Sequence, residues 1–473
     1  MQQLSGLDAT FLNMETGRSP LHVSGLGIYD QSSATGERVT FKGILRNLEA
    51  RLHLARCFRQ KLAPVPFGLD HPYWIEDAEF DLEFHVRHIA LPRPGDWRQL
   101  CIQAARIHAR PLDLGKPLWE MYVIEGLDAV EGLPEKSFAI LTKIHHAAID
   151  GASGVEIAAA IHDLEPGALP PPPKDVWIPE RDPSLIELAV RTTVNNVRQP
   201  LRFARTLQSV APPAIRTAIE RIWSRDPNAS AEPVPRTRFN GRVSSHRVIE
   251  GRSFQLDQVK RIRKQVAGAT VNDVVLCICS GAMRRYLSKH GELPDESLVA
   301  FAPISVRTES ERGTAGNQVS GMMVTLHSQI ADPLERLKRI HEASLESKDL
   351  SNAIGARSLT DMTKSMPGAL MGLAGRVVAR SGLMTRMAPV ANCVVTNVPG
   401  PQVPLYMTEA RMVANYGLGL PMDGLSLFHV VFSYAGTITV TVTCCREALP
   451  DPAFYAECLQ VSFDELRKAA GID

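Results

Sequence analysis

Residues 137–151, SFAILTKIHHAAIDG, contain the pattern that decides the fold of this chain. The first eight residues are apolar almost throughout, which predicts a strand buried on both faces. Residues 147–151 then turn the chain, and residues 152–163, ASGVEIAAAIHD, predict a helix. Rigid elements on both sides hold the side chains of such a turn in place, and this geometry suits a catalytic group.

The turn follows two adjacent histidines, and His146 is the candidate catalytic residue. Imidazole has an unperturbed pKa of about 6.5. It can therefore take a proton from an attacking hydroxyl and return it to a leaving group in the same turnover. Asp150 can fix the loop or one of its partners, and Gly151 removes a side chain where the backbone bends or a substrate approaches.

Coincidence, a zinc site and a serine hydrolase are the other interpretations of this stretch. Two histidines can stand at a strand end by coincidence. A zinc site is disfavoured, because adjacent strand residues point to opposite faces and no third ligand is suggested nearby, so we expect no bound metal. A serine hydrolase is disfavoured because the chain has no G-x-S-x-G motif.

Length and composition limit the class of protein. A chain of 473 residues predicts two domains, and a net charge of +1 gives no overall bias toward nucleic acid. The N-terminus lacks the basic start and apolar core of a secretory signal, and no window approaches the roughly 20 apolar residues of a membrane span. The eight cysteines contain no C-x-x-C pair and sit mostly in apolar runs, which predicts buried free thiols in a reducing cytosol.

Apolar periodicity divides the chain into two mixed halves. Helices are predicted over residues 41–55 and 97–109, and strands at 118–126 and 137–144. The second half predicts a strand near 244–256, a helix from Thr270 to Gly291, and further strands at the runs SLVAFAPISV, GMMVTLHSQI, ANCVVTNV, SLFHVVFSYAG and TITVTVTCC. Thr270 and Asp273 have the spacing of an N-terminal capping box with Asp in place of Glu.

A proline-rich break separates the halves. It begins near residue 166, and a basic segment from Arg191 to Arg225 follows, with Glu220 as its single acid. We therefore predict an N-terminal domain over residues 1–165, a long crossover with a basic helix over 166–240, and a C-terminal domain over 241–473. The mixture of elements predicts an α+β fold of mixed-sheet α/β layers, with a sheet in each half.

The motifs together resemble one protein family. HHAAIDG fits the HHxxxDG signature of the chloramphenicol acetyltransferase-like superfamily, and the wider pattern resembles its bacterial wax ester synthase/acyl-CoA:diacylglycerol acyltransferase branch. The matching pieces, in order, are LDATFL, PLHVSGL, FDLEFHVRHIALPRPG, PLW, HHAAIDG, VNDVVL, PISVR, TNVPGP and CREALP. The resemblance implies two chloramphenicol acetyltransferase-like domains joined by a crossover, with a tunnel between them.

The resemblance also implies roles for individual residues. His146 is the general base and His145 supports its position. Asp150 forms a structural ion pair with Arg307, so its role is scaffolding.

Further candidates come from the other motifs. Asn272 and Asp273 match the family's ND pair, although the start of a helix alone explains both residues. Thr396–Pro401, with Asn397, Pro399 and Gly400, would form the loop that bridges the domains over the tunnel. Trp119 is a candidate substrate-binding residue, but a core anchor is its simpler interpretation.

The implied reaction is direct O-acyl transfer from acyl-CoA to a fatty alcohol, to diacylglycerol, or to both, with no cofactor and no acyl-enzyme. The sequence does not rank these acceptors. The alternatives are a related acyltransferase with a polyketide-type or other hydroxylated acceptor, and a non-catalytic scaffold on lipid droplets. A carrier-dependent condensation domain fits the motifs less well.

Two segments are candidates for contact with lipid. Residues 363–408 contain no Asp or Glu but carry Lys364, Arg376, Arg380 and Arg386 among apolar residues, a composition that can lie in a membrane interface. An ordinary helix packed on the core is the alternative. The basic crossover is the other candidate, and either segment could instead bind the phosphates of CoA. We expect a cytoplasmic protein attached peripherally to the inner membrane or to lipid droplets.

Overall fold

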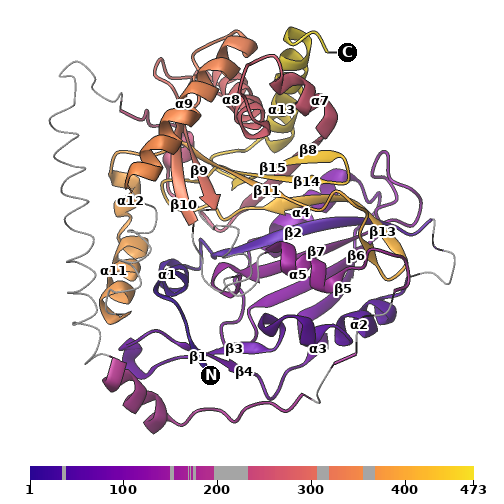
Figure 1. Cartoon of the computed structure of the whole chain (residues 1–473), viewed down its shortest axis with the longest axis vertical. Coiled ribbons are helices and arrows are strands. Elements are labelled where there is room, and N and C mark those ends of the chain that lie inside the picture. The colour runs from indigo at the N-terminus through magenta and orange to yellow at the C-terminus, as the bar shows by residue number, and fades with distance from the viewer. Residues whose placement is uncertain are drawn as a thin grey trace.

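The computed structural model describes residues 1–149 apart from 33 and 35–38, residues 154–195 apart from 169, 171 and 174–176, and residues 233–305, 319–354 and 368–472. Two six-stranded mixed sheets lie one above the other in Figure 1, with helices on their outer faces and one helix, α4 (Trp97–His108), packed between them. A small antiparallel sheet adds the order β1-β4-β3 at the N-terminal end. This arrangement confirms the predicted α+β fold of mixed-sheet layers.

The described helices are α1 (Gly6–Met14), α2 (Phe41–Glu49), α3 (Leu82–His85), α4 (Trp97–His108), α5 (Gly154–Ile161), α7 (Leu256–Arg263), α8 (Val271–Lys289), α9 (Pro333–Ile354), α11 (Gly368–Ser381), α12 (Leu383–Arg386) and α13 (Pro452–Ala469).

The described strands are β1 (Gln2–Gln3), β2 (His22–Asp30), β3 (Gln60–Ala63), β4 (Tyr73–Glu76), β5 (Val86–Ala90), β6 (Trp119–Glu125), β7 (Phe138–His145), β8 (Arg247–Gln255), β9 (Val299–Ser305), β10 (Val319–Thr325), β11 (Cys393–Pro399), β12 (Tyr406–Met407), β13 (Ala410–Leu418), β14 (Phe428–Tyr434) and β15 (Thr437–Cys445).

The first sheet has the order β12-β13-β2-β7-β6-β5 and places the histidine motif at its centre. Strand β7 pairs antiparallel with β2 on one side and with β6 on the other, while β5 and β6 run parallel. Nearly every residue of β7 is buried, as its continuous apolar sequence predicts. The end of β7 is therefore fixed by hydrogen bonds to both neighbouring strands.

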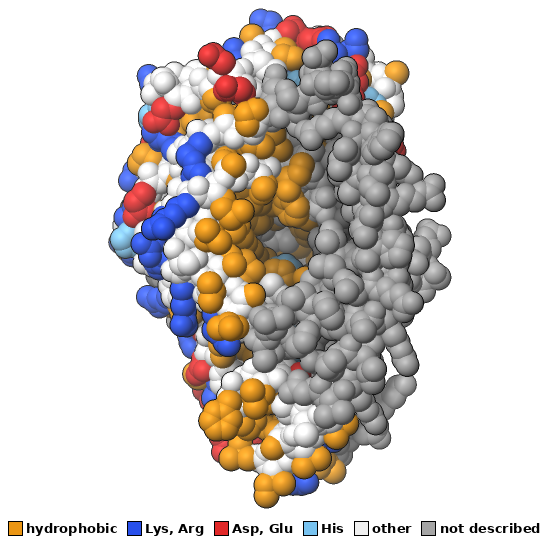
Figure 2. Space-filling model, turned by 90° about the vertical axis from the view of Figure 1, so that its left-hand side faces the viewer, with side chains coloured by type: hydrophobic (Ala, Val, Ile, Leu, Met, Phe, Trp, Pro, Cys, Tyr) orange, Lys and Arg blue, Asp and Glu red, His pale blue; other side chains and the backbone are white. Residues whose placement is uncertain are grey.

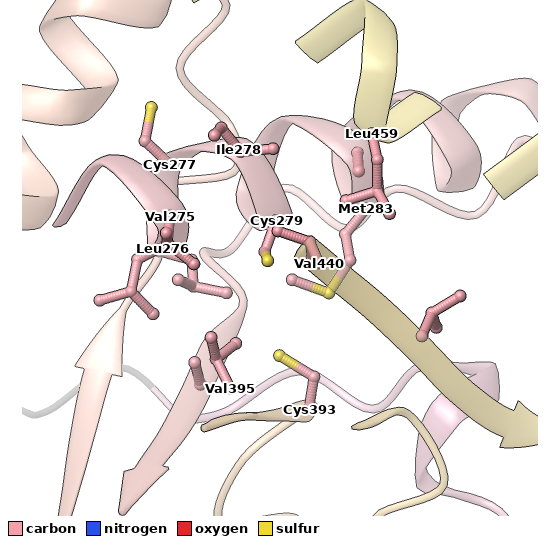
Figure 3. Close-up of a cluster of buried hydrophobic side chains, with 14 of the residues drawn as sticks. Val275, Leu276, Cys277, Ile278, Cys279, Met283, Cys393, Val395, Val440 and Leu459 are labelled. Atoms are coloured by element: carbon pink, nitrogen blue, oxygen red, sulfur yellow. The ribbon is translucent and has the colours of Figure 1, made fainter. Parts of the chain in front are cut away.

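The second sheet has the order β10-β9-β11-β14-β15-β8 and is covered by helices α7, α8, α9 and α13. Figure 3 shows its core, in which side chains of α8 face β11 and β15. Cys279 and Cys393 lie in this cluster with their thiols free. Burial raises the pKa of both thiols, so they behave as small apolar side chains. All eight cysteines are free, which confirms the prediction.

The predicted division of the chain has to be corrected at β12 and β13. These strands belong to the C-terminal part of the sequence, yet they complete the first sheet, where β13 pairs antiparallel with β2 from Arg411↔Asp30 to Leu418↔Ser24. The chain therefore leaves the second sheet after β11 and returns to it at β14. Sequence patterns mark where strands occur, but they do not reveal which sheet a strand joins.

The predicted helix over residues 41–55 is shorter than expected. It ends at Glu49, and a short 3-10 turn follows at Leu52–Leu54. Just past this end, Arg51 is buried, and its guanidinium donates to Asn47 and pairs with Asp163.

Candidate active site

The two histidines stand where β7 ends, and their backbones are fixed by the neighbouring strands. The His145 N–H donates to the Leu118 carbonyl, which immediately precedes β6, at 2.9 Å. The His146 N–H donates to the Leu21 carbonyl, which immediately precedes β2, also at 2.9 Å. A short 3-10 turn, His146–Ala148, then begins. The position of the turn is thus set by three adjacent strands, as a catalytic group requires.

The His145 ring is buried and holds this turn together. Its Nδ1 accepts the Ala147 N–H at 3.1 Å, so in the neutral ring the proton is carried by Nε2. Nε2 donates this proton in a hydrogen bond to Oε2 of Glu15, at a distance of 2.7 Å. Because the side chain of His145 is fully buried, it acts on its neighbours and not on a substrate.

The His146 ring is only partly buried and lies against Phe11 of α1. The two ring centroids are 4.0 Å apart, and the planes differ by 23°. Stacking of this kind restricts rotation of the ring, and it stabilises the folded state by about 0.5–1.5 kcal/mol beyond the burial of apolar area. Helix α1 begins with a cap, since Ser5 Oγ accepts the Asp8 N–H at 3.2 Å. A capped helix thus holds both histidines, one through Phe11 and the other through Glu15.

Strand β2 and helix α4 each carry a neutral imidazole close to this strand end. His22, which faces His145 across the β2–β7 pair, has its Nε2 2.7 Å from the His108 carbonyl. Burial lowers the pKa of His22 well below its ordinary value, and burial lowers that of His108 to about 3. Both rings are therefore uncharged at neutral pH, and neither places a cation beside His145.

Three predicted site residues, Asp150, Gly151 and Arg307, lie outside the described residues. Their roles, including the ion pair between Asp150 and Arg307, stay predictions. The tunnel between the two domains likewise stays a prediction. The basic crossover segment from Arg191 to Arg225 is described only as far as residue 195.

Asn272 and Asp273 lie in the first turn of α8, in the second half of the molecule. The capping box is confirmed, because Asp273 Oδ2 accepts from the Thr270 backbone N–H at 2.8 Å and from its hydroxyl at 2.9 Å. His341 Nδ1 lies 3.0 Å from the same oxygen. These contacts give the Asp273 carboxylate a structural role at the start of α8, whereas a direct role for Asn272 stays a prediction.

We expect Asp273→Ala to lower the free energy of unfolding by about 1–2 kcal/mol, because it removes the carboxylate half of the capping box and leaves the Thr270 N–H without its acceptor. Urea unfolding followed by circular dichroism measures this loss. Asn272→Ala, one residue earlier in the same turn, is the matched control, and we expect it to lower the free energy of unfolding by less than Asp273→Ala does. Equal losses in the two variants would contradict the capping role.

Asn397, Pro399 and Gly400 lie where the chain leaves the second sheet for the first. Asn397 and Pro399 belong to β11, which pairs parallel with β14. A Cβ at Gly400 would stand 2.5 Å from the Ser433 carbonyl oxygen, so only glycine fits beside β14 here. Of the predicted bridging segment, Thr396–Pro399 belong to β11, and only the residues from Gly400 onward connect the two sheets. A place of this segment over a tunnel stays a prediction.

Trp119 lies in the core of the first half. Its indole N–H donates to the Phe58 carbonyl at 3.0 Å, and its ring stacks on His85 with centroids 4.7 Å apart. Only 3% of the residue is exposed. This placement fits the core anchor that the sequence also allowed, and a substrate-binding role stays a prediction.

Sequence reasoning did not single out Glu15 and Phe11, which touch the two histidines. Phe11 falls within the LDATFL motif, but no spacing in the sequence relates it to a residue 135 positions later. Glu15 is a single acid after a short helix, and nothing local separates it from a surface residue. Both contacts arise only from the tertiary packing of α1 on the turn after β7.

The arrangement fits proton transfer to and from a hydroxyl or thiol. A partly accessible imidazole with a fixed ring, next to a buried histidine anchored by a carboxylate, is a suitable general base. The apolar surroundings favour a dry reaction, in which charge developing on a substrate oxygen interacts strongly with nearby dipoles.

Comparison with known proteins identifies related chains over nearly the whole length. Residues 4–275 match the wax ester synthase/diacylglycerol acyltransferase catalytic domain, and residues 315–467 match the C-terminal domain of the same family. A putative diacylglycerol O-acyltransferase from Mycobacterium tuberculosis is 34% identical over 98% of this chain and 91% of its own. A second one from the same species is 33% identical over 99% of this chain and 100% of its own.

Solved structures show the same fold. The wax ester synthase/diacylglycerol acyltransferase from Marinobacter aquaeolei VT8 has a TM-score of 0.69 and 27% identity, with both chains covered completely. A trichothecene 15-O-acetyltransferase from Fusarium sporotrichioides has a TM-score of 0.59 at 10% identity, covering 98% of this chain and 95% of its own. The second likeness bears on the fold alone, and it agrees with the predicted two-domain architecture.

Proposed function

The chain belongs to the wax ester synthase/diacylglycerol acyltransferase family, and from that premise we propose that it transfers a fatty acyl group from acyl-CoA to the hydroxyl of a long-chain alcohol, of diacylglycerol, or of both. The observation that carries the proposal is the partly accessible His146 ring, stacked on Phe11 beside the His145–Glu15 pair. A non-catalytic scaffold would not require this arrangement.

The proposed reaction proceeds by direct transfer. His146 takes the proton of the acceptor hydroxyl, and the hydroxyl oxygen attacks the thioester carbonyl carbon. The C–S bond then breaks as the tetrahedral oxyanion collapses, and the imidazolium returns the proton to the departing CoA thiolate. The products are an ester and free CoA, so proton and electron pairs balance without a cofactor. His145 and Glu15 keep the base in position during both transfers.

Both substrates are partly lipid, so we further propose that the protein works at the surface of the cytoplasmic membrane or of a lipid droplet. Within the described residues, no helix combines the length and apolar character needed to cross a bilayer. Peripheral attachment would place the site beside the phase in which the acceptor and the product ester dissolve.

We expect release of CoA thiol from palmitoyl-CoA to rise when purified protein receives hexadecanol or diacylglycerol. A thiol reagent measures the rate, and thin-layer chromatography identifies wax ester or triacylglycerol. Protein without acceptor is the control for thioester hydrolysis. If neither acceptor raises thiol release above that control, the proposed function is wrong for these substrates. Parallel lines in double-reciprocal plots would indicate an acyl-enzyme and contradict direct transfer.

A further inference from the structure

Helix α11 presents an unusual face to the rest of the protein. It packs on α1, and two glycines lie at the contact. A Cβ at Gly372 would lie 3.2 Å from Asn13 Oδ1, and a Cβ at Gly375 would lie 3.1 Å from Asn13 Cβ. These glycines let the two helices approach closely without an apolar side chain between them at these two positions.

Two large apolar residues of α11 point to the solvent. Leu373 is 57% exposed and Val377 is 54% exposed, and they lie one turn apart on the same stripe. An ordinary surface helix buries such a stripe against the core, whereas this stripe of α11 is left open.

The exposed apolar surface continues beyond α11. Its members, which we call the α11 face, are Phe67, Leu373, Val377, Leu383, Met387 and Val390, all exposed. The 3-10 turn Pro66–Gly68 and helix α12 both contact α11. Phe67 has its backbone in the left-handed region, with φ of 59°, and 96% of the residue is exposed. Figure 2 shows this side of the molecule, with hydrophobic side chains gathered around a hollow.

The charged residues of α11 and α12 are all basic. Arg376, Arg380 and Arg386 are all exposed on α11 and α12, and the sequence from Thr363 to Thr408 contains no acid. The Arg376 guanidinium lies 4.0 Å from a Cβ placed on Gly68, which puts it next to Phe67. Figure 2 shows Lys and Arg side chains along one margin of the apolar area. Exposed apolar residues bordered by arginine complement a lipid surface whose headgroups are anionic.

We propose that the α11 face docks on an anionic phospholipid surface and inserts Phe67, Leu373 and their apolar neighbours among the acyl chains. This inference rests on the proposed function, because that function requires acceptors that are dissolved in lipid. The helix beneath the docked surface is α1, which carries Phe11 and Glu15 against the two histidines. Docking therefore places the lipid one helix away from the candidate base.

Flotation of the full-length protein with phosphatidylcholine vesicles, with and without phosphatidylglycerol, tests the proposal. We expect the protein to float with the anionic vesicles. Leu373→Asp removes an apolar side chain that would insert into the bilayer and adds a charge that anionic lipid repels, so we expect it to lower partitioning by about tenfold or more. Leu345→Asp is the matched control, because Leu345 on α9 is 52% exposed but is not one of the residues of the α11 face, and it should leave partitioning unchanged.

A double variant tests the role of the charges. Arg380→Gln with Arg386→Gln should reduce the preference for vesicles that contain phosphatidylglycerol. The proposal is overturned if Leu373→Asp floats as well as the unmodified protein, or if the unmodified protein does not float. It is also overturned if size-exclusion chromatography shows that Leu373→Asp converts a dimer to a monomer, because a second copy would then cover this face.

Activity without vesicles separates docking from catalysis. We expect Leu373→Asp to keep full transfer from palmitoyl-CoA to a short, water-soluble alcohol. If the unmodified protein floats but transfers no acyl group, the proposed function fails while docking stands. If Leu373→Asp loses transfer to the soluble alcohol as well, the residue acts on the fold or the site, and the docking role is contradicted.

Discussion

Replacing His146 with alanine is expected to lower kcat for acceptor-dependent acyl transfer by about 10²- to 10⁴-fold, because the variant has no imidazole to take the hydroxyl proton. The fold should persist, since the ring is only partly buried. Binding of acyl-CoA should change little, because the base acts on the acceptor. The measurement is initial-rate kinetics with palmitoyl-CoA and hexadecanol, together with thermal unfolding.

A second histidine supplies the control for this experiment. His88 is 39% exposed at its side chain, stacks on Phe41 and lies 3.4 Å from Glu125. His88→Ala removes a more exposed imidazole from the same half of the molecule, and it should leave kcat unchanged. Full activity of His146→Ala would rule out His146 as the base. A large loss in both variants would indicate a general effect on the fold.

Replacing Glu15 with alanine is expected to lower kcat by about 10- to 100-fold, because partners that orient an active-site histidine have effects of this size. The substitution leaves Nε2 of the buried His145 without its acceptor, and a buried unsatisfied donor costs about 1–3 kcal/mol. The His145 ring also accepts the Ala147 N–H, so its displacement would move the turn that starts at His146. We therefore expect kcat to fall with little change in KM.

The conservative variant Glu15→Gln distinguishes positioning from electrostatics. Its amide oxygen can accept the same hydrogen bond from His145 Nε2, so a geometric role predicts that most activity returns. A charge-dependent role predicts that Glu15→Gln remains as impaired as Glu15→Ala. A merely structural role predicts lower thermal stability in Glu15→Ala with unaltered kcat at a temperature where the variant is folded, and that result would contradict positioning.

The residues that form continuous local patterns could be predicted from the sequence. Strand β7, helix α4 and helix α8 with its Thr270–Asp273 cap follow from apolar spacing and end signals, which act within a few residues. His146 could be predicted because a buried strand leads directly into the histidines. The family resemblance added the expectation of paired domains, and the matched family models confirm that family.

The remaining features depend on contacts between distant segments. Glu15 reaches His145 across 130 positions, and β13 joins a sheet whose other long strands come from the first half. The outward orientation of α11 depends on Gly372 and Gly375 facing α1, whereas its sequence alone allows a buried apolar stripe equally well. Tertiary packing determines these contacts and orientations, and the local propensity of a segment does not predict them.

Strand β13, which comes from the C-terminal half but pairs with β2 in the first sheet, limits how far the two halves of the molecule can separate. Two connectors, residues 400–405 and 419–427, join β13 and its neighbour β12 to the second sheet. Each connector is tied at its first residue, since the Gly400 N–H donates to the Ser433 carbonyl at 2.9 Å and the Gly419 N–H donates to the Thr443 hydroxyl at 3.2 Å. A hinge rotation of the two halves would break these bonds or strip β13 from β2. Entry of long acyl chains therefore relies on displacement of loops and side chains around a rigid frame, not on rigid-body separation.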